Sequence, residues 1–143
     1  MLMQHQAVLS NVDWERLKAM ITGLRTSFPA MNDPYERFLD GLEQRLNSAR
    51  TIARNDVDPD LVTMNSSVRI RCLDTNRRRI LKLVYESEAD ALGGKISVLA
   101  GLGAALLWSR VGDAVSWSSR NGVRRVRIER LLFQPEAAGE LDL

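Results

Sequence analysis

Two glycines followed by a lysine, Gly93-Gly94-Lys95, and a second pair, Gly101 and Gly103, are the residues that most resemble a phosphate-binding loop. A Walker A loop has a glycine five residues before its Gly-Lys pair, and Ser or Thr after the lysine. Ala89 and Ile96 occupy those positions here. A dinucleotide site needs a third glycine within a strand–helix–strand unit. The stretch is therefore interpreted as a strand, a tight turn and the start of a helix.

An acidic pair, Asp33 and Glu36, is the second candidate for chemistry, because two carboxylates at the tip of a helical hairpin could hold a metal ion. The same residues also form a helix-start signal. Asp33 is a good N-cap, Pro34 suits the first helical position, and Glu36 completes a capping box. The capping interpretation is favoured, and the pair is treated as the hairpin tip.

The chain has one histidine, His5, and one cysteine, Cys72. A zinc site needs more ligands of these types, and no serine or cysteine has a histidine base near it in the pattern. Cys72 alternates with Ile70 and is predicted to be a small core residue. We expect no catalytic residue, no metal, no cofactor and no small-molecule substrate.

Arginines gather in two runs, one at Arg77, Arg78 and Arg79 and the other at Arg124, Arg125 and Arg127. Solvated strand edges are the favoured interpretation, because charged edges discourage pairing between sheets. A nucleic-acid surface is the alternative, and strong salt dependence of binding would favour it. Residues 61–143 hold thirteen Lys and Arg against nine Asp and Glu, which is a mild excess for a nucleic-acid binder.

The 143 residues suit one ordinary domain with a small appendage, and 45% of them are hydrophobic. No apolar run reaches the length of about 20 residues that a membrane span needs. The first ten residues lack the features of a signal peptide, and a single cysteine cannot form an intramolecular disulfide. These observations predict a cytoplasmic protein.

Two helices are expected in residues 1–55, one from Asn11 to about Leu24 and one from about Pro34 to Ala53. Apolar residues recur at steps of three and four in both. Ser10 or Asn11 can cap the first. Helices with matching seams and a short connection pack antiparallel, so this part is predicted to be a short coiled coil. The seams comprise Trp14, Leu17, Ile21 and Leu24 in the first helix, and Tyr35, Leu39, Leu42, Leu46, Ala49 and Ala53 in the second.

Residues 56–143 begin with a polar linker, after which the hydrophobic period changes to two. Strands are predicted at 68–72, 79–85, 95–99, 114–118 and 126–132, with one helix at 101–108. Asn121-Gly122 is a strong signal for a two-residue hairpin turn, and residues 134–143 are expected to trail off. The prediction is an α+β protein with an antiparallel sheet of about five strands and one helix.

Four segments in order, VTMNSSVRIR, LVYESEADALGGKISVLAGLGAALL, VGDAVSW and LLFQPEAAGE, resemble the Rnk family of nucleoside diphosphate kinase regulators. That family resembles the carboxy-terminal domain of the transcript-cleavage factors GreA and GreB. The resemblance covers residues 61–140. It implies an FKBP-like carboxy-terminal domain, an amino-terminal coiled coil, and docking on RNA polymerase at the rim of the secondary channel.

In Gre factors the turn after the GKIS-type strand contacts a coiled coil of the polymerase's largest subunit. The resemblance therefore implies that Ser97, Leu99, Ala100, Gly101 and Gly103 bind polymerase, although Gly101 stands where Rnk proteins commonly have proline. Because the hairpin is short and its acidic pair resembles caps, no stimulation of transcript cleavage is expected. The protein would compete with Gre factors. An FKBP-like peptide-binding or proline isomerase module is the alternative.

Overall fold

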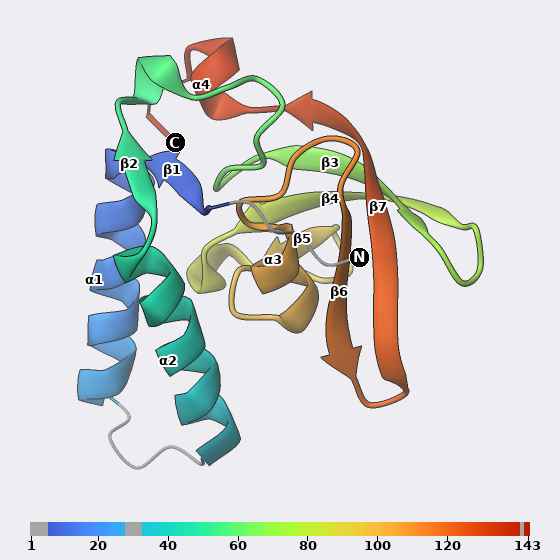
Figure 1. Ribbon diagram of the computed structural model, residues 1–143, viewed down its shortest axis with the longest axis horizontal. Coiled ribbons are helices and arrows are strands. Elements are labelled where there is room, and N and C mark those ends of the chain that lie inside the picture. Colours follow the sequence, from blue (N-terminus) through green and yellow to red (C-terminus); the bar gives the residue numbers. More distant parts are fainter. Residues whose placement is uncertain (1–5, 28–32, 141) are drawn as a thin grey trace. The chain divides into compact units, whose positions relative to one another are not determined.

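The computed structural model describes residues 6–27, 33–140, 142 and 143, except for the side chains of residues 33 and 34 (Figure 1). The described residues divide into two compact units, with the division between Asp56 and Val57. The first unit is mainly helical. The second contains a curled sheet of five strands. Each unit is described by itself below.

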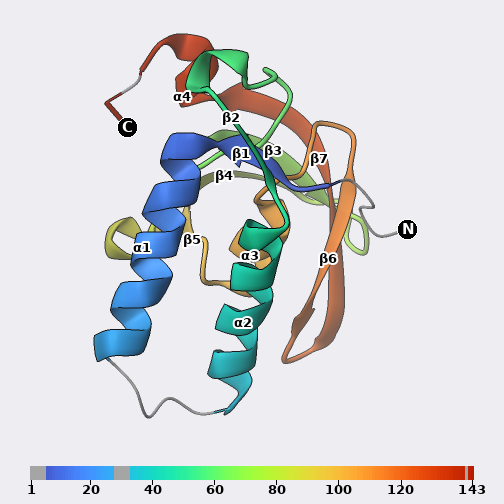
Figure 2. The same ribbon diagram turned by 60° about the vertical axis from the view of Figure 1, so that its left-hand side comes forward.

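Helices α1 (Asn11–Ser27) and α2 (Asp33–Asn47) lie side by side in the first unit (Figures 1 and 2). The hydroxyl of Ser10 accepts a hydrogen bond from the backbone N–H of Asp13 at 3.0 Å and so caps α1, as the sequence predicts. The seam residues Leu17 and Ile21 are fully buried, as is Leu39 on α2. The heptad pattern therefore identified the packed faces correctly.

The predicted end of the second helix at Ala53 is wrong, because α2 ends at Asn47. The chain then forms β2 (Arg50–Ile52), which pairs in parallel with β1 (Val8–Ser10). A backbone hydrogen bond of 2.8 Å from Arg50 to Ala7 leads into this pairing. A short 3₁₀ turn, η1 (Arg54–Asp56), follows. Strand pairing with a segment 42 residues earlier overrides the local helical period, so Ala49 and Ala53 leave the seam.

The sheet of the second unit has the strand order β5-β4-β3-β7-β6. Its strands are β3 (Ser67–Cys72), β4 (Arg78–Val84), β5 (Lys95–Ser97), β6 (Ala114–Ser119) and β7 (Gly122–Phe133). The predicted antiparallel sheet is correct for all pairs except β4 and β5, which are parallel. The segment between them, with the 3₁₀ turn η2 (Glu86–Glu88), carries the chain back so that Lys95 at the start of β5 pairs with Lys82 of β4.

The two faces of this sheet differ in charge. One face buries apolar side chains and curves around α3 (Gly101–Leu106), whose Leu106 is fully buried. The opposite face carries Glu129, which is within 3.3 Å of Arg69, Arg71 and Arg78. Alternation along the strands produces this division. The buried apolar residues of the inner face are Val68, Ile70, Leu81, Leu83, Val115, Val126 and Ile128.

Two local details differ from the sequence prediction. The turn between β6 and β7 lies at Arg120 and Asn121, with Ser119 paired to Gly122, so the predicted turn is displaced by one residue. Gly122 has φ +100°, a conformation that favours glycine. The end of the chain also does not trail off directly, because Pro135–Ala138 forms α4. Buried Gln134 caps α4 and donates hydrogen bonds to the carbonyls of Asp58 and Leu61.

Candidate functional site

The turn predicted to bind polymerase follows β5 and leads into α3. The hydroxyl of Ser97 accepts a hydrogen bond from the backbone N–H of Leu99 at 3.0 Å. The Ser97 carbonyl accepts one from Ala100 at 3.0 Å. These two bonds fix the turn from its first residue. Ser97 itself is 7% exposed, so its contribution is to shape the turn rather than to present a surface.

Gly103 on α3 packs closely against the first residue of the turn. A Cβ atom at this position would lie 1.9 Å from the Ser97 carbonyl oxygen, so only glycine allows α3 to approach so closely. Gly103 is buried. The structure therefore brings all five predicted residues together, but they form two layers. Leu99 and Ala100 are half-buried and Gly101 is exposed, while Ser97 and Gly103 lie beneath them.

Gly101 contacts the edge of an aromatic ring. A Cβ atom at this position would lie 2.8 Å from Cδ1 of Trp117 on β6. The indole therefore occupies the space that a larger residue at 101 would need. Where the Rnk resemblance implies proline, this chain therefore has a glycine, and the Trp117 ring fills the space beside it.

The Gly93-Gly94-Lys95 segment has no free amides for a phosphate. The N–H of Gly93 bonds to the Asp90 carbonyl at 3.0 Å, and that of Gly94 bonds to Ala91 at 3.3 Å. The backbone N–H groups of Lys95 and Asp90 each donate a hydrogen bond of 2.9 Å to the carbonyl of the other residue. The glycines close a tight turn before β5, whereas the turn that the sequence predicted lies after that strand.

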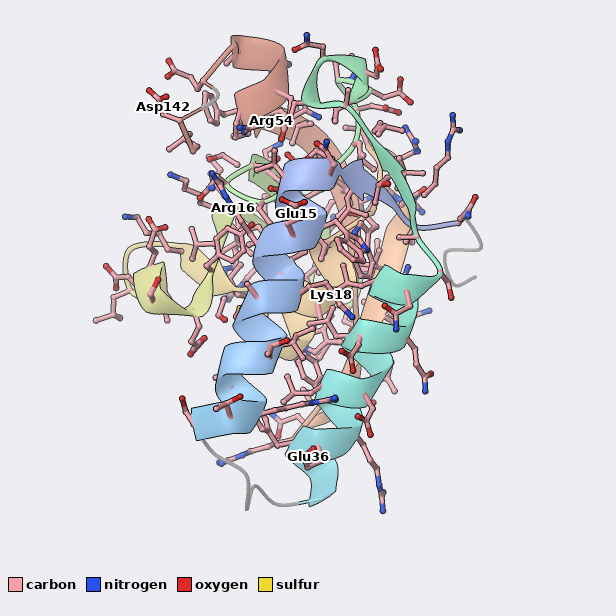
Figure 3. The ribbon with its side chains drawn as sticks, turned by 90° about the vertical axis from the view of Figure 1, so that its left-hand side faces the viewer. Glu15, Arg16, Lys18, Glu36, Arg54 and Asp142 are labelled. Carbon is pink, nitrogen blue, oxygen red and sulfur yellow. The ribbon has the colours of Figure 1, made fainter. Side chains whose placement is uncertain are left out.

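At the hairpin tip, α2 begins at Asp33, and Glu36 is half-buried in its first turn (Figure 3). The predicted capping side chain of Asp33 lies outside the described residues. Within the described part of the chain, no group of three or more His, Cys, Asp or Glu residues could hold a metal ion. In the same described residues, no helix is long and apolar enough to cross a membrane.

Charged side chains join the two helices of the hairpin. Lys18 on α1 is directed toward α2 and lies 3.2 Å from Glu43 (Figure 3). Arg25 reaches the other oxygen of Glu43 at 2.8 Å and also pairs with Asp40. The hydrogen bond from Lys18, together with the positive charges of Arg25 and Lys18, lowers the pKa of Glu43 below its usual value.

Two cavities adjoin the turn, and the sequence gave no signal for either. One, of about 310 Å³, has Ser97 and Ala100 on its wall and Leu81 and Ile96 among its apolar residues. The other, of about 220 Å³, is lined by Leu102 and Trp117 together with arginines from two segments. Both depend on strands that are distant in sequence, so no local pattern could indicate them.

Cys72 lines the second cavity and is half-buried, so its predicted place in the core is wrong. It is the last residue of β3, beyond the part of the inner face that is fully buried. A hydrogen bond from the Thr75 side chain, with backbone hydrogen bonds from Thr75 and Asp74, lowers the pKa of the thiol. Trp117 also lines this cavity, whereas Trp108 is buried in the core.

Comparison with known proteins identifies the family. Residues 57–131 match the sequence profile described as transcription elongation factor, GreA/GreB, C-term. The regulator of nucleoside diphosphate kinase from Escherichia coli K12 is 38% identical over 102 residues, which cover 71% of this chain and 75% of that protein. GreA from Thermotoga neapolitana is 36% identical over 87 residues, covering 61% of this chain and 55% of that protein.

A solved structure agrees with the sequence matches. The prokaryotic transcription elongation factor GreA/GreB from Nitrosomonas europaea is similar with a TM-score of 0.72 and 34% identity. The match covers 89% of this chain and 99% of that one. The helical hairpin, the curled sheet and the turn before α3 thus occur in a chain that belongs to the GreA/GreB carboxy-terminal domain family.

Proposed function

We propose that this protein is a transcription regulator that binds RNA polymerase near the secondary channel and competes there with Gre factors. The observation that carries the proposal is the 38% identity to the regulator of nucleoside diphosphate kinase over three quarters of that protein. The partner follows from the family resemblance, in which the polymerase's largest subunit presents a coiled coil at the channel rim. We also propose that the protein acts in the cytoplasm, where polymerase is found.

The turn at Leu99, Ala100 and Gly101 is the proposed docking surface. Its side chains are small or apolar, and Gly101 is exposed, so a partner's helix can approach the backbone closely. Ser97 and Gly103 hold the turn in one conformation through the hydrogen bonds and the close contact described above. A turn that is already ordered loses little conformational entropy on binding, which favours association.

We further propose that the protein regulates without an enzymatic activity and without stimulating transcript cleavage. In Gre factors an acidic pair at the tip of a long coiled coil helps to hold a catalytic metal inside polymerase. Here α1 has 17 residues, which corresponds to about 25 Å of helix. Glu36 lies in the first turn of α2, where the positive end of the helix dipole stabilises a carboxylate. A hairpin of this length would occupy the mouth of the channel without bringing carboxylates to the catalytic metal.

A competition assay with core RNA polymerase tests the docking proposal. We expect the purified chain to bind polymerase at micromolar concentration and to displace labelled GreA, which also serves as the positive control. The variant Ala100→Glu places a charge in the turn and is expected to weaken binding at least tenfold. Ala138→Glu, at an exposed position of α4, is the matched control and should bind as the parent does.

A second variant, Leu99→Ala, removes side-chain contact from the same turn without adding a charge, and circular dichroism verifies that each variant folds. Absence of binding by the parent chain would refute the proposal. Equal binding by the parent, Ala100→Glu and Leu99→Ala would place the docking surface elsewhere.

A peptide-binding or proline isomerase module is the second candidate, and the cavity of about 310 Å³ beside the turn favours it. A proline isomerisation assay separates the two functions, because docking on polymerase requires no turnover. We expect no catalysis above the uncatalysed rate. The described lining of this cavity contains no aromatic side chain.

A further inference from the structure

Three arginines, two at the start of β4 and one on β7, line a cavity at one end of the inner sheet face. Arg79 on β4 lies opposite Ile70, and Arg124 on β7 lies opposite Trp117. Arg77 precedes β4, and its carbonyl accepts a hydrogen bond from the Cys72 N–H. All three line the cavity of about 220 Å³. The turn between β3 and β4 extends away from α3 (Figure 1), so α3 does not close this end.

These arginines lack acidic partners, unlike the arginines of the opposite face. Glu129 pairs with Arg69, Arg71 and Arg78, and Asp74 pairs with Arg125. No carboxylate among the described residues forms an ion pair with Arg77, Arg79 or Arg124. The cavity therefore gathers three guanidinium groups, none of which forms an ion pair with a described carboxylate.

The floor of the same cavity is apolar and includes an aromatic ring. Ile70, Val126 and Leu102 are buried there, and Trp117 is half-buried. One edge of the Trp117 indole lies beside the backbone of Gly101, because a Cβ atom at position 101 would be only 2.8 Å from Cδ1 of the ring. A ring held in this way offers a flat surface to another planar group at low entropic cost. The combination differs from a solvated strand edge, which needs neither an apolar floor nor a fixed ring.

We propose that this cavity binds a nucleoside phosphate. Guanidinium groups match phosphate oxygens in geometry and charge, and three of them suit a diphosphate or triphosphate. A base packs against Trp117, since nucleobases stack on aromatic side chains. A cavity of about 220 Å³ is smaller than the range of about 300–1,000 Å³ that is usual for ligand sites, so part of the nucleotide stays in solvent. Binding is therefore expected to be weak.

Calorimetry and tryptophan fluorescence with GDP test the proposal on the full chain, without polymerase. We expect saturable binding, and at least fivefold weaker binding of both guanosine and pyrophosphate. Binding should also weaken as salt is raised, because ions screen the exposed guanidinium groups. No saturation by GDP up to several millimolar would overturn the proposal. Equal affinity for guanosine would overturn the phosphate contact, and equal affinity for pyrophosphate would overturn the base contact.

Matched variants locate the site. The double variant Arg79→Gln, Arg124→Gln is expected to weaken GDP binding at least tenfold. Arg69→Gln is the control, because Arg69 lies on the opposite face and leaves two arginines on Glu129. It should bind within twofold of the parent. Equal losses in the double variant and the control would show a general charge effect and overturn the assignment.

Cys72 provides a readout that does not depend on fluorescence. It is the only cysteine of the chain and lines the cavity, and its lowered pKa favours the reactive thiolate. A GDP concentration that saturates the parent should slow the alkylation of Cys72 at least threefold in the parent. The same concentration should leave the alkylation rate of the double variant unchanged. Unprotected alkylation at saturation would contradict binding in this cavity. Protection by single-stranded RNA at lower concentration than GDP would replace the nucleotide with a nucleic-acid strand and refute the proposal.

Discussion

Gly101 and Gly103 are equivalent in the sequence but have different roles in the structure. Gly103 is buried against the Ser97 carbonyl, and no side chain fits there. Gly101 is exposed at the turn, where the Trp117 ring limits its replacement. The same residue type therefore sets the shape of the turn at one position and forms its surface at the other.

The variant Gly103→Ala is expected to lose about 2–3 kcal/mol of stability or more, because its Cβ atom would overlap the Ser97 carbonyl oxygen and force α3 away from β5. Urea unfolding followed by tryptophan fluorescence measures the loss. Gly41→Ala is the matched control, since nothing lies within 4 Å of its new Cβ atom and a helix interior gains about 0.5–1 kcal/mol from the exchange. An unchanged unfolding midpoint for Gly103→Ala would contradict the close contact.

At the scale of elements, ion pairs centred on Glu43 join the two hairpin helices. Lys18 and Arg25 both come from α1, while Glu43 belongs to α2. Their charges and hydrogen bonds lower the pKa of Glu43 in the folded hairpin from its usual value of 4.5. The ionised form is thus stabilised by folding. This contribution is present above pH 4.5 and is lost as the pH falls through the lower, folded pKa.

The variant Glu43→Gln is therefore expected to show a flatter loss of helix stability between about pH 5 and pH 3 than the parent chain. Thermal melts followed by circular dichroism at 222 nm measure it, and the difference should shrink in high salt because the group is partly exposed. Glu15→Gln is the control. Glu15 is exposed on α1 and, among the described residues, joins no ion pair between the helices (Figure 3). Identical pH profiles for parent and Glu43→Gln would refute the role of this ion pair.

At the scale of the whole molecule, one unit contains the proposed docking turn and the other contains a hairpin too short to act as a long probe. Under the proposed function, docking on polymerase and the lack of an effect on transcript cleavage would therefore depend on different parts of the chain. The family relationship supports the first, and the length of α1 and α2 bears on the second.

Backtracked elongation complexes provide the corresponding prediction. Added at saturating concentration, the protein should leave transcript length unchanged and reduce the cleavage that GreA stimulates. Gel analysis of labelled RNA measures both effects, with GreA alone as the positive control. Shortened transcripts in the absence of GreA would contradict the proposal for the hairpin.

Local patterns predicted most elements of the second unit. The alternation at Val68, Ile70 and Cys72 identified β3, and the Ser97–Gly103 segment was correctly interpreted as a turn and a helix start. Patterns of this kind are decided by neighbours in the sequence. Predictions failed where distant segments meet. The pairing of β1 with β2 shortened the second helix, and the crossover after β4 made one strand pair parallel.

The amino-acid sequence by itself determined the helical seams, the strand periods, the glycine turn and, through ordered motifs, the family. Only the tertiary structure decided which of the grouped residues form a surface. It separated exposed Gly101 from buried Gly103, and it divided Arg77, Arg78 and Arg79 between two sheet faces. The physical reason is that periodicity fixes the face to which a side chain belongs, whereas its partners come from strands and helices brought beside it by folding.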